Sequence, residues 1–292
     1  MLSDLRLTLI EKRNYGHGDP DLISGLSKQL ESKLSGVVKP GQSIAICVGS
    51  RGIGKLPDIV ASVVNSVQSE NGKPFIVPCM GSHGGATAEG QISILRDLGV
   101  SEESMGCPVS SGMEVTRIGQ TRFGTDVVVD ALAAEADHII PINRIKPHTD
   151  FFGPIQSGLI KMLAIGLGNH TGAQNYHMAF SEHGFTRVVK AVSGIVLRNL
   201  SIPFGIGIVE NESHEIQQLE LINSRRLIQV ERRLLRMATK RMAHLPNVPY
   251  DLLIVDQIGK DISGSGMDTN VIGMKQGLIR RTIESRTPSP LI

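Results

Sequence analysis

The stretch that decides the fold is Ser43-Ile-Ala-Ile-Cys-Val48, an apolar run that reads as a buried strand. A glycine loop, Gly49-Ser-Arg51-Gly-Ile-Gly54, follows it at once. Pro57 comes next, and proline is favoured in the first turn of a helix. The segment 58–70 then carries apolar residues at helical spacing and ends at Asn71-Gly72. The pattern predicts a strand, a tight loop and a helix.

A second strand and helix repeat this order. Residues 74–78 form an apolar run, the loop Gly81-Ser-His83-Gly-Gly85 follows, and 87–98 has the pattern of a helix. Alternating strands and helices with short glycine links are typical of a parallel sheet covered on both faces. The apolar runs 138–142 and 204–209 read as further buried strands. We therefore predict an α/β fold with a mostly parallel, Rossmann-like sheet and helices on both faces.

Three further segments have weaker patterns. Residues 120–130 are predicted to form a strand or hairpin, and 131–136 a short helix. Residues 224–242 read as a strongly charged helix. Its Arg and Glu side chains are expected to face solvent, as charged runs on helices usually do.

The chain is expected to divide into two parts. Residues 1–246 are predicted to be an N-terminal α/β domain, and Asn247-Val-Pro249 a hinge. Residues 250–292 are expected to be the beginning of a truncated second α/β domain, with one strand at 251–255. One strand and its loop cannot bury a hydrophobic face alone. We therefore expect the tail, 277–292, to be disordered or irregular, or to pack on the first domain.

Composition excludes several classes of function. Thirty basic residues stand against 28 acidic ones, and the chain has no Trp and few other aromatic residues. This gives neither the basic patch nor the stacking platform of a nucleic-acid-binding protein. No window approaches 18 uninterrupted apolar residues and the start resembles no signal peptide, so we expect a cytoplasmic protein without a membrane partner. Three unpaired cysteines argue against a disulfide framework.

Reactive side chains gather in three loops that follow predicted strands. Arg51, in the first loop, is suited to hold a carboxylate through two N–H···O bonds. His83 lies in the second loop, and His148 follows Pro147 in the third. Two imidazoles on opposite sides of a small substrate are what two-sided proton transfer needs. Because ligands bind at the carboxyl ends of strands in open α/β sheets, the loops predict an active site there.

Lys161 and His177 extend this set. Lys161 lies in the otherwise apolar helix predicted at 157–165, where a lysine either extends to water or is a desolvated, reactive amine. The residues leave both readings open. His177 follows a glycine-rich turn and is suited to bind nickel, copper or zinc. Of the remaining histidines, His170 and His183 are further candidates. His138 is expected to be a core or edge residue whose hydrogen bonds are satisfied. His17, His214 and His244 lie away from the cluster in the sequence.

As a set, these residues resemble the lactate racemase family, whose members use a nickel-pincer nucleotide. The resemblance covers roughly 40–270 and includes the arginine loop, Gly81-Ser-His83, Pro147-His148, Lys161 and His177 in order. It implies that Lys161 carries the cofactor covalently and that His177 binds its nickel. It further implies that His83 and His148 are the acid/base groups and that Arg51 holds the substrate carboxylate. Partners implied by the resemblance are a 2-hydroxy acid and the cofactor-synthesis proteins.

The resemblance also implies the reaction. One histidine takes the hydroxyl proton of a 2-hydroxy acid while the Cα hydride passes to the cofactor, and return of the hydride to the other face inverts the centre. The racemases place a lysine shortly after a Lys-Asp-Ile step. Here no lysine follows 260–262 before Lys275, which favours a related hydroxy acid or a sugar acid over lactate.

Two alternatives stay open at this point. A metal-dependent hydrolase would hold a divalent ion with His83, His148 and His177 and keep a fourth position open. A non-catalytic module would bind a nucleotide or cofactor in the glycine loops at the strand ends.

Overall fold

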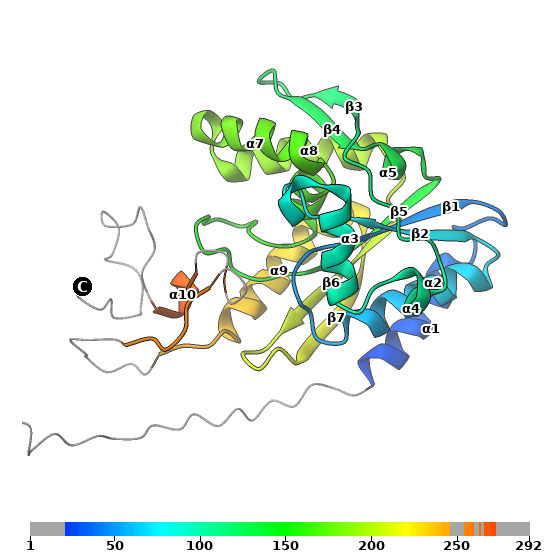
Figure 1. The fold of residues 1–292 in the computed structure, drawn as a ribbon, viewed down its shortest axis with the longest axis horizontal. Helices are drawn as coiled ribbons and strands as arrows, with labels where there is room; N and C mark the ends of the chain where they lie inside the picture. The colour runs from blue at the N-terminus through cyan, green and yellow to red at the C-terminus, as the bar shows by residue number, and fades with distance from the viewer. Residues whose placement is uncertain (1–20, 246–253, 260–262, 264–265, 273–292) are drawn as a thin grey trace, which may run out of the picture.

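The computed structural model describes residues 21–245, 254–259, 263 and 266–272. Its centre is a five-stranded sheet in the order β2-β1-β5-β6-β7 (Figure 1). Four strands run parallel and β7 pairs antiparallel with β6 at one edge. The strands are β1 (Ser43–Val48), β2 (Lys73–Pro78), β5 (His138–Arg144), β6 (Phe204–Glu210) and β7 (Ile216–Asn223). The predicted α/β fold with a mostly parallel sheet is confirmed.

Helices cover both faces of this sheet. Successive side chains of a strand point to opposite faces. In β1, Ile44 and Ile46 therefore pack in one core cluster, and Ala45 and Cys47 in the other. The first cluster is covered by α1 (Leu22–Leu34), α2 (Leu56–Ser69), α3 (Ala88–Asp97) and α4 (Glu102–Met105). The second is covered by α6 (Leu159–Lys161), α7 (Asn169–His183), α8 (Phe185–Asn199) and α9 (Leu227–Lys240).

A separate hairpin lies beside α7 and α8 (Figure 1). It consists of β3 (Val115–Gln120) and β4 (Asp126–Asp130), and α5 (Ala131–Glu135) follows. The predicted hairpin is thus confirmed, although its first strand begins five residues before the predicted segment. The buried hydroxyl of Tyr176 on α7 bonds both the N–H and the C=O of Val128, at 3.0 and 3.1 Å. This fixes α7 against β4.

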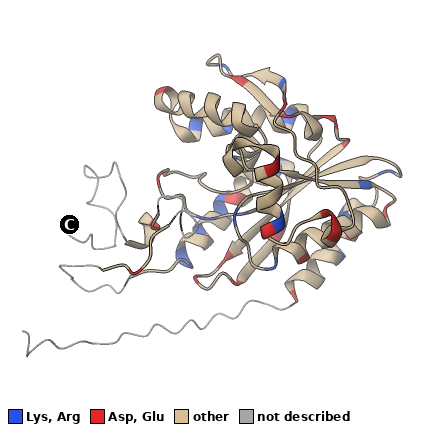
Figure 2. Cartoon of the chain, viewed as in Figure 1, with Lys and Arg blue, Asp and Glu red and all other residues tan. Residues whose placement is uncertain are grey.

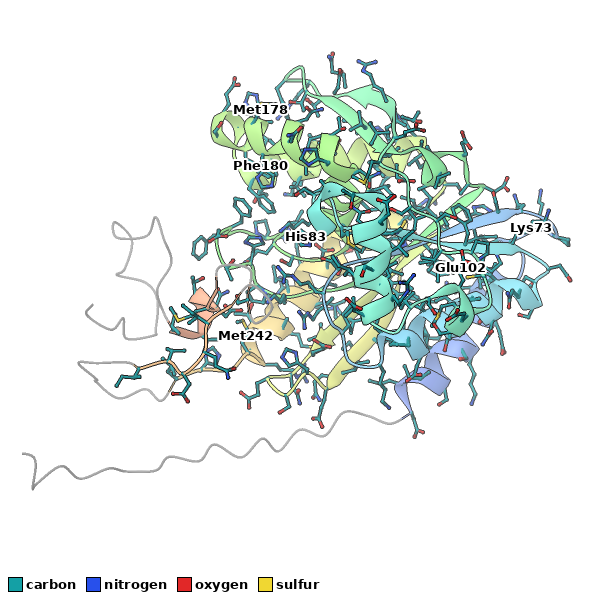
Figure 3. The ribbon with its side chains drawn as sticks, in the orientation of Figure 1. Lys73, His83, Glu102, Met178, Phe180 and Met242 are labelled. Atoms are coloured by element: carbon teal, nitrogen blue, oxygen red, sulfur yellow. The ribbon has the colours of Figure 1, made fainter. Side chains whose placement is uncertain are left out.

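The order of the strands positions the candidate site. β1 lies between β2 and β5, so the chain leaves β1 toward one side and later returns on the other. Ligands of open α/β sheets bind outside the carboxyl ends of the strands at such a switch point. In Figure 3, Lys73 marks the start of β2 and His83 follows its end. The loops after β1, β2 and β5 therefore share one edge of the sheet.

The predicted helices form close to their expected positions. The segment 58–70 is α2, and 87–98 is α3, whose N-cap Thr87 accepts the N–H of Gly90 at 3.1 Å. Cys47, Cys79 and Cys107 are free and buried. Figure 2 shows acidic and basic residues interspersed over the helices, in keeping with the balanced charge. The helices α1, α7 and α8 and the edge strand β7 were not predicted.

Several predictions about the second half of the chain fall outside the described residues. They are the hinge at 247–249, the Lys-Asp-Ile step at 260–262 and the tail at 277–292, so the domain boundary stays a prediction. Ile254 and Val255 are exposed and belong to no strand, so the predicted strand is absent at the two of its residues that are described. Within the described part, no helix is long and apolar enough to cross a membrane.

The prediction that the charged side chains of the helix at 224–242 face solvent is wrong at Glu231 of α9. This residue is 1% exposed, and its Oε2 accepts the N–H of Ile160 at 2.9 Å. The N–H of Leu159 also bonds this carboxyl group. The first N–H groups of a helix lack partners within it and carry positive partial charge, so a buried carboxylate stabilises the start of α6. Gly158 provides the space, because a Cβ there would lie 2.6 Å from Cδ of Glu231.

The burial of Glu231 predicts a pH-dependent stability. Burial raises its pKa from 4.5 to about 7, although bonds from the two N–H groups oppose the rise. Between these values the folded protein keeps a proton that the unfolded chain has released, so the free energy of unfolding falls as pH rises through this window. At about 1.4 kcal/mol per unit of pKa, the total loss is roughly 3 kcal/mol.

We expect Glu231→Gln, which keeps one acceptor, to lose this contribution. Urea unfolding of the parent and the variant at about pH 5 and about pH 7.5 measures this contribution. The fall in the free energy of unfolding between the two pH values should be larger in the parent than in the variant. Glu220→Gln, a change at the half-buried ion-pair partner of Arg233, is the control. An identical pH dependence in parent and Glu231→Gln would show that the carboxyl group does not titrate in this window.

Candidate functional site

The loop after β1, which carries Arg51, is anchored by a buried carboxylate. Glu210, on β6, accepts the N–H of Gly54 through Oε1 at 2.5 Å, and its other oxygen pairs with the guanidinium of Arg144. A Cβ at Gly54 would lie 2.5 Å from the carbonyl oxygen of His214, so this close approach requires glycine. The ends of β5 and β6 thereby hold the loop in place, and Arg51 is exposed on it.

The loop after β2, which carries His83, touches the segment that follows Lys161. The N–H of Gly81 donates to the carbonyl of Gly166 at 3.2 Å. A Cβ at Gly166 would lie 2.5 Å from the carbonyl oxygen of Cys79. From the other side, the buried Gln91 of α3 donates to the carbonyl of Gly81 at 2.9 Å. Glycines thus allow two backbones to meet, which brings His83 and Lys161 to one place.

His83 is held by the neighbouring loop. Its Nδ1 lies 2.5 Å from the hydroxyl of Ser50, which precedes Arg51. Partial removal from water, and then the positive charges of Arg51 and Lys161, lower the pKa of His83 below its ordinary value. The imidazole is therefore neutral at neutral pH, the form that accepts a proton.

The loop after β5 carries His148 and is fixed from within. Lys146 and Ser157 exchange a pair of backbone hydrogen bonds of 3.1 and 3.2 Å. The side chain of Gln156 accepts the N–H of His148 at 2.8 Å. The N–H groups of Asp150 and Phe151 donate to Nδ1 of His148, at 2.9 and 3.2 Å.

A distant segment, 266–272, packs on the same loop. The buried hydroxyl of Thr269 donates to the carbonyl of Thr149 at 2.6 Å, and Nδ2 of Asn270 donates to the carbonyl of His148 at 3.2 Å. Asp268 lies 3.6 Å from the amine of Lys146. We call Asp268, Thr269 and Asn270 the clamp. It ties the loop of His148 to residues about 120 positions later in the chain.

Three phenylalanines connect His148 with His177. Phe151 stacks on Phe185 with ring centroids 4.1 Å apart and an angle of 6°, and Phe180 meets both edge-on. The ring of His148 packs on Phe151 at 4.7 Å, and that of His177 on Phe180 at 5.1 Å. In Figure 3, Phe180 lies at the same end of the sheet as His83. The two imidazoles therefore border one aromatic cluster.

Lys161 ends α6, and a π-helical turn, Met162–Gly166, follows it. Such turns occur frequently at functional sites. Removal from water and the charge of Arg51 lower the pKa of Lys161 to about 8, with Asp150 opposing and Lys146 adding to the shift. Burial and the charges of Arg144 and Arg51 also lower the pKa of Lys146, against the attraction of Asp268. Mutual repulsion among Arg51, Lys146 and Lys161 makes this edge a place for an anion.

The five predicted site residues thus lie in one neighbourhood. The charge of Lys161 acts on both His83 and His177 and lowers the pKa of each, with burial the larger cause in both. Arg51 acts on Lys161, and the aromatic cluster connects His148 to His177. His177 lies within α7, not after a turn as predicted. The prediction missed Ser50, Lys146, Asp150 and the clamp; only Lys146, beside Pro147-His148, gave a signal in the sequence.

The other histidines that the structure describes lie outside this set. His183 packs on Phe123 at 4.4 Å, and His170 buries an Nδ1 without a partner. His138 was expected to have its hydrogen-bonding groups satisfied. Its Nδ1 lies 2.8 Å from the hydroxyl of Ser201, whereas its buried Nε2 has no hydrogen-bond partner among the described residues. Among the described residues, which include His83, His148 and His177, no three His, Cys, Asp or Glu side chains are placed to hold a metal ion. The ligand set of the hydrolase alternative is therefore not formed.

A family model described as the lactate racemase N-terminal domain matches residues 21–187, more than half of the chain. The chain belongs to this family. The matched range contains the five residues that the sequence predicts for the site, Arg51, His83, His148, Lys161 and His177. A comparison with curated proteins gave no match.

Two solved structures share the fold. One is a crystal structure of a protein from Thermotoga maritima, with a TM-score of 0.63 and 14% identity over 81% of this chain and 63% of that one. The other is the lactate racemase apoprotein from Thermoanaerobacterium thermosaccharolyticum, with a TM-score of 0.61 and 15% identity over 79% and 57%. The chain therefore spans less than two thirds of the length of each.

The lowered pKa of Lys161 predicts a reactive amine. At about pH 8 roughly half of it is unprotonated, whereas an ordinary lysine, with a pKa near 10.4, is less than about 1% unprotonated. Acylation with limiting acetic anhydride, followed by peptide mass spectrometry across a pH series, should show labelling of Lys161 that reaches half its maximum near pH 8.

The variant Arg51→Gln removes a positive neighbour and should move that midpoint to higher pH. Arg117→Gln, an exposed ion-pair partner of Asp126 on the hairpin, is the matched control and should not move it. Labelling of Lys161 with an ordinary lysine profile in the parent would contradict the assignment.

Proposed function

We propose that the protein is a racemase or epimerase of a 2-hydroxy acid or sugar acid, and that it depends on a nickel-pincer nucleotide attached to Lys161. The observation that carries the proposal is the partly buried Lys161 amine, whose charge acts on both His83 and His177 in a member of the lactate racemase N-terminal domain family. Such an amine is suited to covalent attachment of a cofactor at neutral pH.

The residues present fit this cofactor. Lys161, with its pKa lowered to about 8, supplies a nucleophile for the attachment. His177 supplies a nickel ligand, because its lowered pKa keeps the imidazole neutral, the form that binds a metal. When bound, the cofactor would accept a hydride from the substrate and return it. The chain's other residues must then bind the acid and handle one proton.

The positive groups at this edge fit the carboxylate of a hydroxy acid. Arg51 and Lys146 both act on Lys161 as positive neighbours. An anion relieves this repulsion, and an arginine can bind a carboxylate through two parallel N–H···O bonds. We therefore assign Arg51, assisted by Lys146, to the substrate carboxylate.

His83 is the group best suited to take the hydroxyl proton. Its lowered pKa favours the neutral ring, and with Nδ1 beside Ser50 the proton is accepted at Nε2. As the O–H bond breaks, its electron pair forms the C=O bond and the hydride leaves Cα. When the acid is formed again, His83 would restore the proton to the oxygen, and the face of the carbonyl that takes up the hydride would decide which enantiomer results.

Intact-mass spectrometry with nickel analysis tests this proposal. The chain is produced together with cofactor-synthesis proteins, and we expect a mass increase that Lys161→Arg abolishes. Lys146→Arg, a change of lysine in the same charged group, is the matched control and should keep the adduct. His177→Ala should keep the adduct but lose most of the nickel. A parent protein without adduct, or a Lys161→Arg variant that still carries it, would refute the proposal.

A cofactor-binding module without turnover is the second candidate. The chain spans 57% of the length of the lactate racemase apoprotein that it matches, so cofactor binding and turnover are tested separately. Chiral analysis of a panel of 2-hydroxy acids separates the two functions. Adduct and nickel without interconversion of any enantiomer pair would favour the module.

A further inference from the structure

The two edges of the central sheet differ in how their backbone groups are used. At the β2 edge, residues after α4 pair with Ile76: its N–H donates to the carbonyl of Pro108 at 2.8 Å, and its carbonyl accepts the N–H of Ser110 at 2.9 Å. At the other edge, β7 is the last strand of the sheet in the part of the chain that the structure describes. The backbone of an edge strand is a template for pairing with another chain. An added strand would therefore lie beside β7.

The register of β7 decides which of its backbone groups face outward. The N–H of Ser224, just after β7, donates to the carbonyl of Pro203. Along an antiparallel pair, residues that bond the neighbouring strand alternate with residues that do not. In the register between β6 and β7, Ile222 therefore bonds β6, whereas the N–H and C=O groups of Leu219 and Leu221 point away from it. These two residues present backbone donors and acceptors at the edge.

A groove of about 370 Å³ lies beside the end of β7. The end of β7 and the start of β6 line it, together with residues from α1 and α9, which contact β7 on its two faces (Figure 1). The strand β6 begins at the groove with Phe204 and ends at Glu210, which anchors the loop of Arg51. The groove and the candidate site therefore lie at opposite ends of the sheet.

Positive charge surrounds this groove. Lys33 comes from the last turn of α1, Arg226 from the turn before α9, and Arg233 from α9 itself. Glu220 of β7 is the acidic residue of the lining, and it pairs with Arg233. Three positive charges against one negative charge leave an excess of two. Such a surface favours an occupant with negative charge.

The two walls of the groove differ in character, and an added strand would meet both. Successive side chains of a strand point to opposite faces of the sheet. On the α9 side they would meet Arg226 and Arg233, and on the α1 side the apolar Val37 and Leu221 together with Lys33. The groove therefore fits an extended segment with acidic residues at alternate positions and apolar residues between them.

We propose that the β7 edge binds an extended, acidic segment of a partner protein as a sixth strand of the sheet. Backbone hydrogen bonds to Leu219 and Leu221 supply affinity, and ion pairs with Arg226 and Lys33 supply the preference for acidic sequences. A small anion would use the charges but none of the outward backbone groups. A second copy joined β7 to β7 would bring the same excess of positive charge together, which opposes that pairing.

Synthetic hexapeptides test strand addition on the full chain. The probe is acetyl-(Val-Glu)₃-amide, and one analogue carries lysine in place of glutamate. In titration calorimetry we expect the probe to bind and the lysine analogue not to bind. In an added strand, only one set of alternate N–H groups faces β7. N-methylation of either the valines or the glutamates should therefore abolish binding, and N-methylation of the other set should not.

Hydrogen exchange resolved by residue locates the bound peptide. The amide of Ile222 bonds β6 in the chain alone, so its slow exchange should not change. The amides of Leu219 and Leu221 should exchange about tenfold more slowly at a probe concentration of about ten times its Kd. Strong protection of these two amides before the probe is added would show that this chain itself occupies the edge, and would overturn the proposal.

Charge variants test the preference for acidic sequences. Lys33→Gln and Arg226→Gln should each weaken binding of the probe about tenfold, through the loss of one charge-assisted hydrogen bond. Lys28→Gln on α1 and Arg232→Gln on α9 are matched controls, because both residues are exposed and lie outside the lining. Their affinity for the probe should equal that of the parent.

Three further results would each overturn the proposal. A probe that does not bind, or that binds equally well with either set N-methylated, excludes an added strand. Displacement of the probe by inorganic pyrophosphate at a similar affinity assigns the groove to a small anion. A dimer in sedimentation that Leu221→Pro dissociates assigns the edge to a second copy, because proline lacks the outward N–H.

Discussion

The candidate site depends on the close approach of two backbones, where the turn after Lys161 meets the loop after β2. Gly166 lies so near the carbonyl of Cys79 that any side chain would collide with it, and the N–H of Gly81 bonds the carbonyl of Gly166. A larger residue at Gly166 would force these segments apart, and the influence of Lys161 on His83 falls with their separation. The electrostatic properties of the site therefore follow from a steric condition at a residue that carries no functional group.

Two buried carboxylates support this arrangement from opposite sides. Glu210 holds the loop of Arg51 against the ends of β5 and β6, and Glu231 holds the first turn of the helix that ends at Lys161. Glu210 is paired with Arg144. Among the residues that the structure describes, Glu231 bonds uncharged N–H groups and its Oε1 has no partner. A buried carboxylate without a cation is expensive. The bonds of Glu231 order the first turn of the helix that bears Lys161, while its burial makes ionisation of the carboxyl group costly.

The central fold was predictable because its signals are local. In β1 and α2, the apolar run, the glycine loop and the helical spacing lie within about thirty residues and each follows from backbone geometry. The helix α7 was missed because its buried residues are few and, apart from Tyr176, small or polar, so that its hydrophobic period is weak. Burial of Glu231 could not be predicted, since the N–H groups that it bonds belong to residues about 70 positions earlier. Arg51, His83, His148, Lys161 and His177 were found because their residue types are unusual among glycines and apolar residues. The bond between His83 and Ser50 joins two loops 33 positions apart and depends on tertiary contacts.

The clamp has a consequence for how such proteins are recombined. Asp268, Thr269 and Asn270 belong to the region beyond the matched family range, yet they hold the main chain on which His148 sits. A chimera that joins the matched N-terminal range of this chain to the C-terminal part of a relative would replace all three of these side chains. Its junction should lie after residue 272, because an earlier crossover would leave the loop of His148 supported by a foreign sequence.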